Sequence, residues 1–139
     1  MVRAEPLNET LVQTLRELRE DPAVVVRLYE QIYRATFWGL VADPTARLEE
    51  MAFLSYPSDT TMHEMPVFTA PERPLLRELA MRAETATVIC IEGPLLWRRM
   101  LDLVRTGKCE AAIDPADEHG IRLTREMILG MVERFGDVG

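Results

Sequence analysis

The second half of the chain alternates between helical and strand-like segments, and this alternation limits the folds open to it. From residue 69 onward the sequence predicts, in order, a helix through Ala83, a strand over Thr85–Ile91, a helix from Gly93 to just before Gly107, a strand over Glu110–Asp114, and a last helix capped by Thr124 and ended by Gly136. When a helix joins two parallel strands of one sheet, the connection is a right-handed crossover. The segment order therefore predicts at least one such crossover within a mixed sheet.

Two local patterns in this half carry specific predictions. The segment Thr69-Ala-Pro-Glu72 has the residues of a capping box, in which the threonine hydroxyl and the glutamate side chain bind free N–H groups at the start of a helix. The run from Thr85 to Ile91 is nearly continuous in β-branched and apolar residues, which is typical of a strand buried on both faces. We therefore expect this strand to lie centrally in the sheet.

The first half predicts two helices followed by three strands. Asn8 suits the N-cap of the first helix, and Asp21-Pro22 suits the start of the second, which continues to about Arg34. Turn residues separate three runs that suggest an antiparallel meander: Phe37–Ala42, Glu49–Tyr56 and Met62–Phe68. Pro66 cannot donate to a ladder and is expected at a strand edge or end. The order ααβββαβαβα predicts an α+β fold, with a mixed sheet of about five strands covered by helices.

Size and charge argue against several classes of protein. The chain has 139 residues, 47% hydrophobic and 28% charged, which suits a single domain over residues 1–139 with no second domain. The formal net charge of −7 disfavours nucleic acid and anionic membrane surfaces as partners. No apolar run approaches the roughly 20 residues that span a bilayer, and the N-terminus does not resemble a signal peptide, which predicts a cytoplasmic protein. Cys90 and Cys109 lie in or beside strand-like runs and are expected to be buried thiols.

Residues that usually carry catalysis or bind cofactors are sparse. No glycine-rich loop precedes a helix, which argues against nucleotide binding. Ser58, Asp59 and His63 share one turn, but catalytic triads usually draw their members from separate elements. The two histidines, His63 and His119, are far apart in the chain, so we predict no metal, no cofactor and no catalytic residue. The polar segment 114–120 is expected to be a solvated loop rather than a calcium loop, because alanine occupies a position that requires an oxygen ligand.

The second predicted helix carries an apolar arc wider than one packing face needs. Once the sheet and the first helix are covered, four residues remain at the edge of this helix or just beyond it: Val26, Tyr29, Tyr33 and Trp38. An exposed apolar patch that contains tyrosine is typical of a protein interface. These four residues are the predicted interaction site for a protein partner or a second copy of the chain. The alternative is that the N-terminal segment or the last helix folds over this edge.

The eight methionines allow two interpretations. Methionine at helical spacing usually fills a core, and this interpretation is favoured here. The alternative is an adaptable binding groove lined by methionine.

Six short stretches resemble one known family. They are Leu11-x-x-x-Leu15, Asp21-Pro22-Ala23, Leu28-Tyr29, Phe37-Trp38-Gly39-Leu40-Val41, Met65-Pro66-Val67-Phe68-Thr69-x-Pro71-Glu72-Arg73 and Ala112-Ile113-Asp114-Pro115. They are similar to the N-terminal domain of the SseB family, bacterial proteins named for enhanced serine sensitivity, and the likeness extends from about Asn8 to Phe135. The family often has asparagine where this chain has Asp114, and its longer members continue into a second domain.

The resemblance implies an α+β domain of the bacterial cytoplasm with no established enzymatic activity and no assigned catalytic residues. The expected function is a non-enzymatic protein-interaction or regulatory module. The alternative is a domain that senses a small molecule, such as an amino acid or a related metabolite, as the family's name suggests. An enzyme with an unrecognised site comes third.

Overall fold

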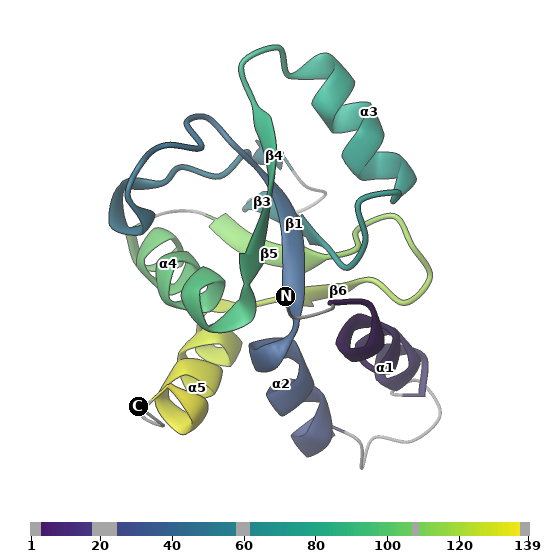
Figure 1. Cartoon of the computed structure of the whole chain (residues 1–139). Helices are drawn as coiled ribbons and strands as arrows, with labels where there is room; N and C mark the ends of the chain where they lie inside the picture. The colour runs from purple at the N-terminus through teal and green to yellow at the C-terminus, as the bar shows by residue number, and fades with distance from the viewer. Residues whose placement is uncertain (1–3, 18–24, 58–61, 107–108, 137–139) are drawn as a thin grey trace.

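The computed structural model describes residues 4–17, 25–57, 62–106 and 109–136 (Figure 1). Its helices are α1 (Ala4–Glu17), α2 (Val25–Arg34), α3 (Pro74–Arg82), α4 (Gly93–Thr106) and α5 (Arg125–Phe135), and a short 3-10 helix spans Leu48–Glu50. Its strands are β1 (Thr36–Val41), β2 (Tyr56–Pro57), β3 (His63–Phe68), β4 (Thr87–Glu92), β5 (Cys109–Ile113) and β6 (Ile121–Leu123). They form one mixed sheet in the order β4-β1-β3-β5-β6, with β2 paired to β3. The predicted α+β class with a mixed sheet is confirmed.

Strand β3 joins the antiparallel and parallel parts of the sheet. Strand β1 runs antiparallel to both β4 and β3, whereas β3 runs parallel to β5. The chain passes from β3 to β5 through α3, β4 and α4, so the parallel connection predicted from the segment order is present. Strand β6 pairs antiparallel with β5 and is not predicted from the sequence, because three residues are too few to show a periodic pattern.

The two faces of the sheet carry cores of unequal size. Helices α1, α2, α4 and α5 contribute to the larger core, in which the indole N–H of Trp97 donates to the Ile32 carbonyl at 2.9 Å and the Trp97 ring meets Phe37 edge to face. Strand side chains alternate between faces. On the other face Leu40 and Phe68 pack with Leu76 of α3 in a smaller core. Figure 1 shows α3 set apart from the other four helices.

Strand β4 lies at the edge of the sheet, so the prediction of a central strand buried on both faces is wrong. It pairs with β1 and packs mainly against α4. Val88 is 39% exposed, Cys90 is exposed and Cys109 is only partly buried, so the two thiols are not the buried pair predicted. Partial burial, with a smaller contribution from the Glu92 carboxylate, raises the pKa of the Cys90 thiol. β-branched residues favour extended backbone at any position in a sheet, and for this reason the run does not reveal its neighbours.

The predicted strand over Glu49–Tyr56 is mostly absent, and the simple meander is therefore wrong. A 3-10 turn occupies Leu48–Glu50, and β2 contains only two residues. Between them, Phe53 forms a single bridge with Val41 of β1. Strand β3, rather than this segment, is the main partner of β1 on that side.

Pro66 lies inside β3, not at the predicted strand edge or end. The carbonyl of Val67 accepts from the Asp114 N–H on the β5 side, so the nitrogen of the preceding proline faces the opposite side. On that side β2 pairs with His63 and Glu64, and β1 pairs with Val67 and Phe68. Pro66, which has no N–H, therefore lies between the part of β3 that pairs with β2 and the part that pairs with β1. No ladder hydrogen bond is lost there.

The ends of the helices agree only in part with the predictions. Thr124 caps α5 by accepting from the Met127 N–H, and Gly136 follows the helix as predicted. Helix α1 begins at Ala4, before the predicted cap Asn8, and the predicted start of α2 at residues 21–22 lies outside the described residues. Within the described part of the chain, none of the helices has the length and apolar character needed to cross a membrane.

Candidate functional site

The carboxylate of Asp114 is the most deeply buried charge-bearing group in the described structure. Asp114 follows β5, and Thr69 follows β3. These strands are parallel neighbours, and Val67 pairs with Ile113, so their carboxyl ends place the two polar residues together. The Asp114 side chain is 0% exposed, and its backbone has φ of 47°. Aspartate tolerates this left-handed conformation better than most residues do.

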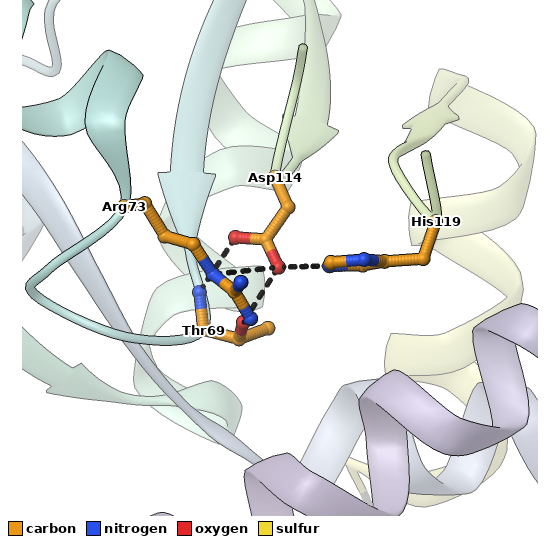
Figure 2. A network of polar contacts seen from close by, with 4 residues as sticks. All are labelled: Thr69, Arg73, Asp114 and His119. Carbon is orange, nitrogen blue, oxygen red and sulfur yellow. Dashed lines mark hydrogen bonds and ion pairs between the residues drawn. The ribbon is translucent and has the colours of Figure 1, made fainter. Parts of the chain in front are cut away.

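Four groups converge on this carboxylate (Figure 2). The backbone N–H of Thr69 donates to Oδ1 at 2.8 Å, and the Thr69 hydroxyl donates to Oδ2 at 2.5 Å. Nε2 of His119 lies 2.6 Å from Oδ2, and Nε of Arg73 lies 3.5 Å from the same oxygen. Arg73 also donates from Nη2 to the Thr69 hydroxyl at 2.8 Å. We call Thr69, Arg73, Asp114 and His119 the Asp114 network.

The Asp114 network corrects two predictions. Thr69 binds Asp114 instead of forming a capping box, and α3 begins only after Arg73, with Pro74 at its first position. The loop 114–120 is not simply solvated, because Asp114 and His119 at its two ends are buried. A buried carboxylate requires donors or cations to offset its desolvation, and in this fold Thr69 supplies two donors and Arg73 a nearby cation.

Hydrogen bonds within the Asp114 network already occupy most of the atoms that could bind a cation. Asp114, Asp117 and His119 hold potential ligand atoms within 4.8 Å of one another, a spacing compatible with a cation. However, both oxygens of Asp114 already accept from protein donors, and Nε2 of His119 faces Asp114. The Thr69 hydroxyl donates to Oδ2 of Asp114 and accepts from Arg73, so both of these contacts lie within the network. The network links two loops and supports the residues around it.

A cavity of about 360 Å³ lies beside the Asp114 network, between α1 and the loop that follows β3. Its lining residues are Glu9, Val12, Gln13, Arg16, Thr69, Ala70 and Arg73. Two members of the Asp114 network, Thr69 and Arg73, thus form part of its wall.

A second polar cluster occupies the face of the sheet that carries α3. Glu64 is buried and accepts from the Tyr56 hydroxyl at 2.7 Å and from Nε of Arg122 at 3.1 Å. Burial of the phenol, followed by its hydrogen bond to Glu64, raises the pKa of Tyr56 well above its usual value.

The structure does not bring the four predicted interaction residues together. Tyr33 is only 2% exposed and packs against Phe135 of α5, with ring centroids 5.7 Å apart. This is the arrangement in which the last helix covers the edge, and it makes Tyr33 a core residue in this conformation. Trp38 packs with the smaller core on the opposite face of the sheet, and the side chain of Val26 lies outside the described residues.

Tyr29 is the predicted residue that does line an open surface. A groove of about 420 Å³ lies between α2 and α5, lined by Tyr29, Glu126, Met127, Gly130, Met131, Arg134 and Phe135. A Cβ added at Gly130 would meet no atom within 4 Å, so the groove is open above this glycine. We call it the α2–α5 groove.

The sequence contained partial signals for both features. The polar residues Thr69 and Asp114 each follow a strand-like run. That they meet becomes clear only from the parallel pairing of the two strands that precede them. For the groove, Tyr29 is one of the predicted interaction residues, whereas the position of α5 beside α2 came from tertiary packing. The favoured interpretation of the methionines as core residues agrees with the burial of Met51, Met65, Met100 and Met131.

Comparison with known proteins adds no relative: no family model, curated protein or solved structure matches the chain.

Proposed function

We propose that this chain is a non-enzymatic protein-interaction module that binds an amphipathic helix of a partner protein in the α2–α5 groove. The observation that carries this proposal is an open groove with an apolar floor between two helices, with Tyr29 on one wall and Met127 on the other. Tyrosine and methionine are enriched at protein interfaces. The resemblance to the SseB family, which implies a regulatory module of the bacterial cytoplasm, points in the same direction.

The shape of the α2–α5 groove favours a helix as its occupant. Helices pack by placing the ridges of one into the grooves of another, and a small residue at the contact lets the backbones approach closely. Gly130 supplies such a position, because the space above it is empty. Met127 is only partly buried and adds a flexible apolar side chain that adapts to the partner's surface, whereas Met131 is 1% exposed and belongs to the core beneath the groove.

The charges at the rim define the partner's chemistry. Glu126 and Arg134 both line the groove and are eight residues apart on α5, which corresponds to about 12 Å along the helix axis. The partner helix should therefore present an apolar stripe, with a basic residue facing Glu126 and an acidic residue facing Arg134. Such complementary charges set orientation more than they add affinity.

The polar chemistry of the fold is consistent with binding rather than catalysis. The carboxylates of Asp114 and Glu64 are both buried and both bind protein donors within the fold. These contacts stabilise the loops and the sheet. The groove itself is lined mainly by apolar side chains, which suits recognition of an apolar surface.

The test fills the groove and asks whether a partner is lost. Gly130→Trp places an indole in the groove, and Arg125→Trp puts the same side chain on an exposed residue of α5 that does not line it. A photo-cross-linking residue at position 127, in the wild-type chain expressed in its native cell, identifies the peptide that occupies the groove.

The expected result is a cross-linked partner peptide with an amphipathic helical pattern, captured by the wild type and by Arg125→Trp but lost in a folded Gly130→Trp variant. Capture that survives in Gly130→Trp would overturn the proposal. A cross-link to a second copy of this chain, with a dimer that Gly130→Trp dissociates, would replace the heterologous partner with self-association.

A further inference from the structure

The cavity between α1 and the loop after β3 combines features that the α2–α5 groove lacks. Helix α1 contributes Glu9, Gln13 and Arg16, which share one face of the helix at spacings of four and three residues. The loop contributes Thr69 and Arg73 from the Asp114 network. Charged and polar groups from two separate segments therefore converge on one concavity.

Arg73 is held in place before any ligand arrives. Its Nη2 donates to the Thr69 hydroxyl, its Nε lies 3.5 Å from Oδ2 of Asp114, and its side chain is 24% exposed. Within the Asp114 network Nη2 makes a hydrogen bond, Nε lies at ion-pair distance without a hydrogen bond, and Nη1 makes neither contact. Ordering of an arginine is a cost of binding, and a guanidinium that is already fixed avoids most of it.

The charges of the cavity select an anion that also carries a donor. Two arginines and one glutamate line it, so the lining itself carries a formal charge of +1 within a chain of net charge −7, with the buried Asp114 carboxylate behind Arg73, 3.5 Å from its Nε. Guanidinium groups bind carboxylates through paired N–H donors. The Glu9 carboxylate accepts hydrogen bonds and repels a second full negative charge, which disfavours a phosphate dianion.

We infer that this cavity binds a small organic carboxylate that also bears an amino or hydroxyl group. Arg16 and Arg73 bind the carboxylate, and Glu9 accepts from the amino or hydroxyl group of the ligand. The volume of about 360 Å³ lies within the range of roughly 300–1,000 Å³ that small-molecule sites occupy. This inference is independent of the α2–α5 groove, because the lining residues of the two do not overlap.

The test measures binding of defined probes to the whole chain. L-lactate and L-alanine carry one carboxylate and a donor, propionate lacks the donor, and inorganic phosphate lacks the carboxylate. Thermal unfolding in millimolar probe reports binding, because a ligand that binds only the native state raises Tm. Isothermal titration then gives Kd.

The variants separate binding from folding. Arg16 lies on the exposed face of α1, so its substitution should not disturb the fold. Arg16→Gln should weaken the affinity for the probe on the order of tenfold or more, because a charged hydrogen bond is lost. Arg105→Gln, an exposed arginine of α4 away from the cavity, should bind as the wild type does. Glu9→Gln should reduce the preference for lactate or alanine over propionate.

Saturable stabilisation by lactate or alanine that Arg16→Gln removes and Arg105→Gln retains is the expected outcome. Three results would overturn the inference: neither probe raises Tm, both arginine variants respond as the wild type does, or phosphate binds as tightly as the carboxylates. None of these cavity variants alters the α2–α5 groove. The partner-capture experiment with Gly130→Trp therefore tests the proposed function independently.

Discussion

The Thr69 hydroxyl lies 2.5 Å from Oδ2 of Asp114 and joins residues that are 45 positions apart in the chain. The bond connects the end of β3 to the end of β5, its parallel neighbour. It is buried, and its threonine oxygen also accepts from Arg73. The Thr69 hydroxyl therefore links, through its hydrogen bonds, the loop before α3 and the loop after β5, and Thr69 also lines the cavity beside α1.

Removal of the Asp114 carboxylate should destabilise the fold strongly. Asp114→Ala leaves the Thr69 donors, Arg73 and His119 without their acceptor, and breaking a buried charge pair in this way costs about 3–5 kcal/mol. Asp114→Asn should cost less, because asparagine tolerates the positive φ and retains one acceptor oxygen. Urea unfolding checks both. Asp117→Ala, at a partly exposed position of the same loop, should change the free energy of unfolding by no more than about 0.5 kcal/mol, and an equal loss would contradict the role assigned to Asp114.

Glutamate substitutions at the two tyrosines of α2 should have opposite effects. Tyr33→Glu replaces a buried ring that packs on Phe135 with a carboxylate and should cost more than about 3 kcal/mol, because desolvating a charge is costly. Tyr29→Glu places the charge at the wall of the α2–α5 groove, where water reaches it, and should leave Tm within a few degrees while partner capture is lost. Thermal unfolding and cross-linking check the pair. A stable Tyr33→Glu variant would return this residue to the exposed surface predicted from the sequence.

Two glycines should respond in opposite directions to alanine. At Gly93 an added Cβ would lie 2.2 Å from the Tyr33 carbonyl oxygen and 2.6 Å from that of Ala35, and backbone atoms cannot move aside without disturbing the start of α4. Gly93→Ala should therefore destabilise the chain by at least about 1–3 kcal/mol. At Gly130 the space is empty, and replacing a helical glycine by alanine should stabilise by about 0.5–1 kcal/mol. Denaturant midpoints measured side by side test the contrast, and equal shifts at both sites would contradict it.

Stability should decline at high pH through Tyr56. Its folded pKa is raised above the ordinary value of 10.0, so the folded state holds the phenol proton more tightly than the unfolded state does. The resulting stabilisation is fully present below pH 10.0 and falls as pH rises above that value. Tyr56→Phe has no phenol to titrate, and the difference in unfolding free energy between wild type and variant should shrink from neutral pH to about pH 11. Parallel pH profiles for the two proteins would argue against the burial of this group.

Much of the architecture follows from local patterns along the chain. The apolar stripes and end residues of α4 and α5 predict helices where the structure has them. The runs predicted at 37–42, 62–68 and 110–114 appear as strands over 36–41, 63–68 and 109–113. These elements are predictable because helical and strand periodicity is a property of neighbouring residues. The α+β class and the parallel connection follow from their order alone.

The positions of these elements relative to one another were decided by tertiary structure. The Thr85–Ile91 run predicts a strand but not its place at the edge, since β-branched side chains favour extended backbone in any strand of a sheet. Thr69 has the sequence context of a helix cap, yet a buried carboxylate from a distant loop competes for the same hydroxyl and binds it. Tyr33 has the pattern of an interface residue until α5 packs over it. In each case the deciding partner is far away in the chain, and a sequence pattern reports only the preferences of residues near one another, whereas burial and pairing depend on which segments meet.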